Sequence, residues 1–265
     1  MSLIQIIVLA LIQGLTEFLP VSSSAHLILG SRVFGWPDQG LVFDVATHLG
    51  TLLAVLIYFR HELVDMARAC LGPVRDDQDR QHRKLAIYLA IASIPALLAG
   101  FAARDLVELF LRDVRVIAWA TIGFGLLLWL ADAVGSRQRK LEETTLKDAL
   151  VIGLAQALAL IPGVSRSGVT ITAGRFLGLS PDSAARFSFL LAIPIIAAAG
   201  GFGALRVAMG DAPIDWAEFG LAMGLAALAG WVCVAAFLAL LKRVGLMPFV
   251  VYRLLLGVVL VWMLN

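Results

Sequence analysis

Six apolar stretches of 16 to 23 residues most constrain what this chain can fold into. A hydrocarbon core about 30 Å thick takes about 20 apolar residues per helical crossing. The stretches that approach or reach this length cover residues 41–59, 85–103, 116–131, 187–205, 219–241 and 246–264. The sequence therefore predicts an all-α polytopic membrane protein that forms a single membrane domain over residues 1–265.

The scarcity of charge supports this class and excludes others. Of the 265 residues, 60% are hydrophobic and only 15% are charged, against about 25% charged in an average soluble protein. A formal net charge of +2 provides no basic surface for nucleic acid. Two cysteines, Cys70 and Cys233, are too few for a disulfide scaffold. We therefore expect the bilayer, and no nucleic acid, as a partner.

Two further apolar regions, residues 1–30 and 149–180, are interrupted by proline and serine. The first breaks at Pro20, which precedes Val-Ser-Ser-Ser, and the second at Pro162, which precedes Gly-Val-Ser-Arg-Ser. Non-helical backbone at membrane depth is tolerated only where protein buries it or where it lines a wet cavity. We therefore predict two re-entrant helical hairpins whose tips meet inside the membrane.

A shift of 143 residues places one broken region on the other. The polar matches are Gln13 on Gln156, Ser22 on Ser165, Ser24 on Ser167 and Arg32 on Arg175. They predict two repeats, about 1–135 and about 145–265, each made of one hairpin and three transmembrane helices. Because three is odd, the second repeat would be inverted relative to the first, as in many transporters.

The lysines and arginines predict the orientation. Fourteen of the 21 fall in four segments that share one side under this topology, namely 60–84, 132–148, 175–186 and 242–245. Four fall in the opposite loops, 104–115 and 206–218. Cytoplasmic loops carry the excess of Lys and Arg. We therefore expect the first set to be cytoplasmic and both termini to lie outside.

Glu17 is a carboxylate within an apolar segment. It follows Gln13 by four residues, so both side chains lie on one helix face. An acid in a membrane segment costs about 2.5 kcal/mol or more on insertion scales, which makes it a functional candidate. The alternative is a structural carboxylate that pairs with an arginine across the bundle.

A serine cluster and a histidine follow in the same loop. Ser22, Ser23 and Ser24 precede His26, and one helical turn separates Ser23 from His26. A hydroxyl bonded to a base is the minimal activated nucleophile. The alternative is structural, because serines cap helices and a lone histidine is usually part of the packing.

The second loop has the composition of an anion site. It holds Arg166 among hydroxyls and glycines, and a helix begins near Ser167 with its positive end toward the loop. The planar fork of arginine binds two phosphate oxygens at once. The alternative, which does not exclude the first, is an arginine that neutralises Glu17.

Acid, base, nucleophile and anion cradle in one pocket are the components of hydrolytic phosphoryl transfer. A site inside the membrane implies a lipid-borne substrate whose tail lies among the helices. The sequence has no HExxH motif, Cys/His cluster or P-loop, so it shows no cage that would hold a metal with protein ligands alone.

The two loops resemble the signature motifs of the bacterial undecaprenyl-diphosphate phosphatases, the bacitracin-resistance family. The likeness is carried by the runs from Gln13 to His26, from Pro162 to Thr170 and from Pro248 to Arg253, and it extends over nearly the whole chain. Many members have Glu where this chain has Gln13. That departure moves an acid or base role to Glu17.

The resemblance implies hydrolysis of undecaprenyl diphosphate to undecaprenyl phosphate and inorganic phosphate. This reaction recycles the lipid carrier for peptidoglycan synthesis, at a site that opens to the periplasm from the bacterial inner membrane. It also implies a divalent cation, Mg²⁺ or Ca²⁺, which we expect at Glu17 and Gln13 together with substrate phosphates. A homodimer is a further expectation, because the glycines between Gly220 and Gly230 allow close helix packing within or between chains.

Under this hypothesis Ser23 attacks the terminal phosphorus with His26 as its base, or His26 or Glu17 activates water instead. The expected catalytic residues are Glu17, Ser23, His26 and Arg166. The expected diphosphate-binding residues are Ser22, Ser165, Arg166, Ser167 and Thr170.

The alternative function is a carrier that flips a polyprenyl phosphate or moves a small anion, which the inverted repeats explain equally well. The Ser–His–Glu set favours the enzyme.

Overall fold

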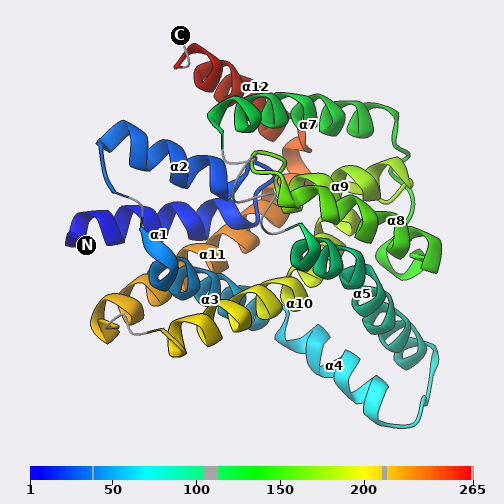
Figure 1. The fold of residues 1–265 in the computed structure, drawn as a ribbon. Helices are drawn as coiled ribbons and strands as arrows, with labels where there is room; N and C mark the ends of the chain where they lie inside the picture. Colours follow the sequence, from blue (N-terminus) through cyan, green and yellow to red (C-terminus); the bar gives the residue numbers. More distant parts are fainter. Residues whose placement is uncertain (38, 104–112, 211–213, 264–265) are drawn as a thin grey trace.

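The computed structural model describes residues 1–37, 39–103, 113–210 and 214–263, and these ranges are almost entirely helical (Figure 1). The side chains of residues 31–33, and with them the predicted repeat position Arg32, lie outside the description. So do the loop charges predicted within 104–112 and 211–213. The helices are α1 (Leu3–Glu17), α2 (Ser23–Phe34), α3 (Gly40–Tyr58), α4 (Arg60–Leu71), α5 (Asp77–Ala102), α7 (Val114–Val134), α8 (Leu146–Ala157), α9 (Arg166–Phe176), α10 (Pro181–Ala208), α11 (Trp216–Val244) and α12 (Met247–Trp262).

Five of the helices have the length and apolarity of a membrane crossing, namely α3, α5, α7, α10 and α11. They confirm five of the six predicted crossings. The sixth, predicted at 246–264, is the 16-residue helix α12. Sixteen residues rise about 24 Å, which is less than the thickness of the hydrocarbon core. The predicted sixth crossing therefore corresponds to a shorter apolar helix, and its passage through the membrane stays a prediction.

Both broken regions form the helix–loop–helix units that the sequence predicts. The loop between α1 and α2 contains Pro20, and the loop between α8 and α9 contains Pro162 after a short 3₁₀ turn, Leu158–Leu160. Proline ends a helix because it lacks the N–H donor and its ring clashes with the preceding turn. In Figure 1 the two loops meet near the centre of the molecule.

The first arm of each hairpin packs against a long helix of the other half of the chain. Helix α1 lies along α11, and α8 lies along α5. A glycine permits each close approach. A Cβ on Gly14 would lie 2.7 Å from the carbonyl oxygen of Ala226, and one on Gly153 would lie 2.4 Å from that of Ala92. Small residues at such contacts are typical of membrane helix pairs.

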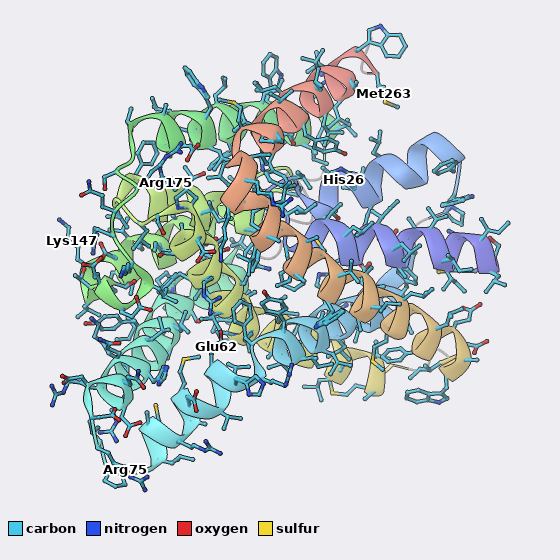
Figure 2. The ribbon with its side chains drawn as sticks, turned by 180° about the vertical axis from the view of Figure 1, so that it is seen from behind. His26, Glu62, Arg75, Lys147, Arg175 and Met263 are labelled. Atoms are coloured by element: carbon cyan, nitrogen blue, oxygen red, sulfur yellow. The ribbon has the colours of Figure 1, made fainter. Side chains whose placement is uncertain are left out.

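Charged side chains gather toward one side of the molecule. Figure 2 shows Arg75 and Lys147 toward one side and Met263 at the opposite end, with His26 between them. Both basic residues belong to the set predicted to be cytoplasmic. The membrane orientation itself stays a prediction.

Arg175, one member of that set, lies near the end of α9 and is not exposed. Its side chain is fully buried. Its guanidinium donates to Asp132 Oδ1 at 3.1 Å and to the carbonyl oxygen of Ser136 at 2.7 Å. Arg175 therefore fastens the end of α9 to the end of α7.

A second ion pair holds the start of α8. Arg139 Nη2 donates to Asp148 Oδ2 at 2.6 Å, while Thr145 and Asp148 form a capping box. Burial alone would raise the pKa of the Asp148 carboxyl, but the hydrogen bonds from Arg139 and Thr145 outweigh it and hold that pKa below its ordinary value of 3.8.

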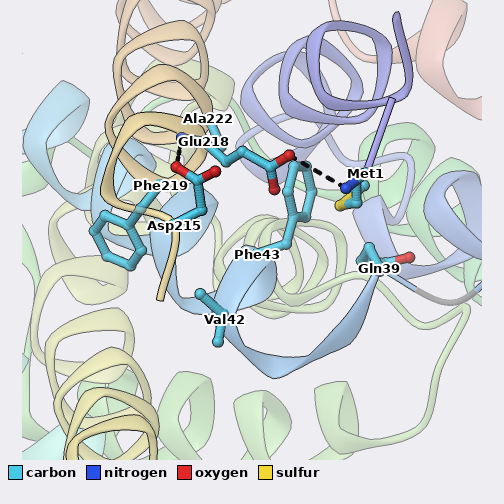
Figure 3. Close-up of a pocket in the computed structure, with 8 residues that line it drawn as sticks. All are labelled: Met1, Gln39, Val42, Phe43, Asp215, Glu218, Phe219 and Ala222. Atoms are coloured by element: carbon cyan, nitrogen blue, oxygen red, sulfur yellow. Dashed lines mark hydrogen bonds and ion pairs between the residues drawn. The ribbon is translucent and has the colours of Figure 1, made fainter. Parts of the chain in front are cut away.

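A polar hollow of about 160 Å³ lies between the start of the chain, α3 and α11 (Figure 3). Its carboxylates already have partners. Glu218 Oε1 accepts a hydrogen bond from the Met1 ammonium at 3.2 Å, and Asp215 caps α11. None of the predicted site residues lines this hollow.

Candidate functional site

The carboxylate of Glu17, the last residue of α1, joins the two hairpins. Its Oε2 accepts hydrogen bonds from Gln13 Nε2 and from Ser23 Oγ, both at 2.9 Å. Its Oε1 accepts from Arg166 Nη2 at 3.2 Å. An ionised carboxylate only accepts, so it satisfies all three donors at once. The predicted Gln13–Glu17 face and the predicted Glu17–Arg166 ion pair are both present.

Arg166 is the first residue of α9 and enters the site from the second hairpin. Besides Glu17, its guanidinium donates to the carbonyl oxygen of Ser188 at 3.0 Å and lies 5.8 Å from the ring centroid of Phe18. Within the described chain these bonds use two of its five N–H donors. The guanidinium is therefore fixed in place and still has the chemistry to bind an anion.

The two loops repeat one unusual backbone conformation. Ser22 has φ 74° and Ser165 has φ 69°, a left-handed region that residues other than glycine rarely adopt. The hydroxyl oxygens of Ser22 and Ser24 lie 3.2 Å apart, and so do those of Ser165 and Ser167. These are the positions that the 143-residue shift equates. Strain of this kind is concentrated at functional sites.

Other predicted hydroxyls bond within the protein. Ser167 Oγ donates to the carbonyl oxygen of Leu19 at 2.8 Å, which ties the second loop to the first. Thr170 Oγ1 donates to Ser188 Oγ at 2.7 Å, and Ser165 Oγ accepts from the N–H of Gly168 as the cap of α9. These bonds position the loop around Arg166, and Ser165 also caps α9.

His26 and Ser23 have different partners from those predicted. Nδ1 of His26 bonds to the carbonyl oxygen of Ser22 at 2.7 Å, and Nε2 bonds to the hydroxyl of Tyr252, whose ring is parallel to the imidazole. A carbonyl oxygen only accepts, so Nδ1 carries the hydrogen and Nε2 of the neutral ring accepts from Tyr252. Ser23 begins α2, where side chains lean back toward the helix start, and its hydroxyl reaches Glu17 instead.

An unpartnered oxygen beside Glu17 fits the expected cation. Oε1 of Gln13 is buried and has no hydrogen-bond partner among the described residues. Amide and carboxylate oxygens are the ligands that Mg²⁺ and Ca²⁺ prefer. No group of three His, Cys, Asp or Glu side chains in the described ranges forms a metal site by itself. Gln13 and Glu17 therefore suit a cation that substrate phosphates and water complete.

Three residues at this centre were not predicted for it: Ser188 on α10, and Tyr252 and Arg253 on α12. Arg253 is fully buried and donates to carbonyl oxygens of both loops, including Pro20 at 3.2 Å and Gly163 at 2.9 Å. The sequence pointed to Tyr252 and Arg253 only through the Pro248–Arg253 run of the resemblance, which assigned neither of them a role. Ser188 had no signal.

Comparison with known proteins agrees with the two motifs. The model of the family described as "Bacitracin resistance protein BacA" matches residues 6–259. The chain is 53% identical to "Undecaprenyl-diphosphatase 1" of Pseudoalteromonas translucida, with 97% of each chain covered. It is 54% identical to "Undecaprenyl-diphosphatase 2" of Stutzerimonas stutzeri, with 98% of this chain and 97% of the relative covered. It is 51% identical to the "Undecaprenyl-diphosphatase" of Teredinibacter turnerae, with 98% of each covered. This chain therefore belongs to the bacitracin resistance protein BacA family.

Proposed function

We propose that this protein is a membrane undecaprenyl-diphosphatase, which hydrolyses undecaprenyl diphosphate to undecaprenyl phosphate and inorganic phosphate and so recycles the lipid carrier for peptidoglycan synthesis. The observation that carries the proposal is the convergence of Ser23 and Arg166, from different hairpins, on the carboxylate of Glu17. Membership in the BacA family supports the same activity.

The diphosphate binds at the junction of the two loops in this proposal. Arg166 and the positive N-terminal end of α9 face that junction. Helices α3, α5, α7, α10 and α11, which are long and apolar enough to cross a bilayer, surround the loops and accommodate the polyprenyl tail.

Ser23 is the nucleophile and Glu17 is its base. The hydroxyl of Ser23 already donates to Glu17 Oε2 at 2.9 Å. The carboxylate takes this proton as Oγ forms a bond to the terminal phosphorus and the bridging P–O bond breaks, which releases undecaprenyl phosphate. Water then cleaves the phosphoserine and restores both groups. In the competing route Glu17 takes the proton from water, which attacks phosphorus directly.

Arg166 stabilises the charge that develops on the phosphoryl oxygens, the main task of a protein in phosphoryl transfer. Glu17 and Oε1 of Gln13 would hold a Mg²⁺ or Ca²⁺, which would supply further positive charge near these oxygens. His26 is held beside the junction by Ser22 and Tyr252, and a role as base requires Nε2 to exchange Tyr252 for water.

The two halves form an inverted repeat in this proposal, with hairpins that enter from opposite faces of the inner membrane. Two observations support it. Ser22 and Ser165 share the same strained backbone conformation. The first arm of each hairpin also packs on a helix of the other half, α1 on α11 and α8 on α5. The topology puts both termini and the opening of the site on the periplasmic side. A homodimer stays a prediction.

Phosphate release from a C15 or C55 polyprenyl diphosphate tests the function directly. The purified protein in detergent is assayed with Mg²⁺, with Ca²⁺ and with chelator, and release that the chelator abolishes is expected. Measurable binding of the diphosphate without release under any cation condition would contradict the enzyme and favour the carrier.

A further inference from the structure

Arg253 is a buried cation without a carboxylate partner. Its side chain is fully buried in α12, and no Asp or Glu oxygen lies within 4.0 Å of its guanidinium in the part of the chain that the structure describes. Its four hydrogen bonds all go to backbone carbonyl oxygens. They reach Thr121 at 3.2 Å, Pro20 at 3.2 Å, Val164 at 3.0 Å and Gly163 at 2.9 Å.

This arrangement differs from that of the other two buried arginines. Arg175 has Asp132 as its counterion, and Arg166 has Glu17. Taking a charge out of water is costly unless an opposite charge compensates it. Because Glu17 and Arg166 neutralise each other, Arg253 leaves the junction of the loops with an excess of one positive charge. A diphosphate would supply the missing negative charge.

Three of these bonds also fix the two loops against each other, and the fourth ties Arg253 to Thr121 on α7. Pro20 lies two residues before the strained Ser22, and Gly163 and Val164 directly precede the strained Ser165. The packing around the guanidinium is close. A Cβ on Gly168 would lie 3.0 Å from Nη1 of Arg253. A displacement of Arg253 would therefore move both loops.

We propose that Arg253 is a positioning residue for the diphosphatase reaction, which holds the Ser22 and Ser165 loops in register and attracts the diphosphate with its uncompensated charge. The proposal rests on the proposed function. It assigns Arg253 two separable contributions: the bonds that fix the loops, and the charge.

Two variants separate them, R253K and R253M. The lysine keeps the charge but lacks the planar fork that reaches four carbonyl groups. We expect kcat to fall about 100-fold, as for other small misplacements of reacting groups, with KM within about threefold of wild type. The methionine keeps much of the volume and removes the charge. We expect the same loss of kcat and a KM for the C15 diphosphate raised about tenfold or more. The attraction between the guanidinium and the diphosphate is lost, and such an attraction is strong where little water screens it.

R175M is the matched control, because Arg175 is equally buried and bonds carbonyl groups at the other end of α9. We expect a lower melting temperature in detergent with kcat and KM of the folded protein unchanged.

Two outcomes would overturn the proposal. The first is that R253K and R253M melt at lower temperatures than wild type but keep its kcat and KM. Failure of both to fold while R175M folds would also overturn it, in favour of a structural clasp. If wild type releases no phosphate, the proposed function fails. The role of Arg253 in binding can then be tested separately, by the rise in melting temperature when the C15 diphosphate is added. We expect R253M to lose this rise. The same rise in R253M as in wild type would overturn the proposal.

Discussion

Replacing Glu17 with glutamine removes the charge of the carboxylate on which both hairpins converge and keeps its shape. If the glutamine oxygen takes the place of Oε2, the bonds from Gln13 and Ser23 survive. The amide nitrogen then faces Arg166 Nη2, and two donors meet. In the opposite orientation Arg166 keeps an acceptor, while Gln13 and Ser23 lose theirs. At least one buried donor is left unsatisfied either way.

The effects on stability and on rate have separate magnitudes. Removal of one partner from a buried ion pair costs about 3–5 kcal/mol of folding stability, an upper figure here because glutamine retains one acceptor. Loss of a general base slows the chemical step about 10²- to 10⁴-fold. That corresponds to a barrier higher by about 2.7–5.4 kcal/mol. Only the second effect lowers kcat per folded molecule.

The assay is phosphate release from a C15 diphosphate, normalised to folded protein by thermal unfolding in the same detergent. Glu62→Gln is the control, because Glu62 pairs with Arg186 away from the loops and its loss should leave kcat unchanged. If Glu17→Gln kept kcat within about tenfold of wild type, a loss smaller than that expected of a general base, the base assignment would be wrong.

Four further substitutions test the site and its surroundings. Arg166→Ala should abolish turnover, and near-normal release would refute its role in holding the diphosphate. Ser23→Ala should reduce kcat at least about 100-fold if a phosphoserine forms, whereas an unchanged rate would establish attack by water. Tyr252→Phe removes the donor to Nε2 of His26, so kcat should fall with little change in melting temperature, because the stacked ring remains. The lowered pKa of Asp148 stabilises the fold fully above its unfolded value of 3.8 and loses this effect as pH falls through the folded value. The melting temperatures of wild type and Asp148→Asn should therefore differ most at about pH 7 and approach each other as the pH falls below 3.8, and a difference that stays unchanged at low pH would contradict this assignment.

The helices were predictable where a local pattern determines them. Uninterrupted apolar runs gave five crossings, and Pro20 and Pro162 gave the two breaks, because each signal acts within a few residues. The end of α12 was not predictable in this way, since the apolar run continues beyond the last helical turn. The buried partner of Arg175 was not predictable either, because Asp132 lies 43 residues away in the sequence.

In the site, too, the contacts within one helix were predictable and the contacts between distant residues were not. The Gln13–Glu17 contact follows from i, i+4 spacing within one helix, so the sequence predicted it. The Ser23–His26 bond did not follow from a spacing of one turn, because the helix begins at Ser23 and His26 faces α12. Tyr252 reaches His26 across 226 residues. In so apolar a chain no polar periodicity indicates which face of α12 lies against the loops.

The distribution of charge between the two loops explains why neither half would suffice alone. The 143-residue shift that equates Ser22 with Ser165 also equates Ser23 with Arg166, and both of these donate to Glu17. It equates Glu17 with Leu160, so the second loop has the cation and no carboxylate. Its Gln156 is correspondingly buried with both amide atoms unpartnered among the described residues. If the two hairpins are the repeats that the shift predicts, one supplies the acid and nucleophile and the other the phosphate clamp, which requires the proposed site to lie at their junction.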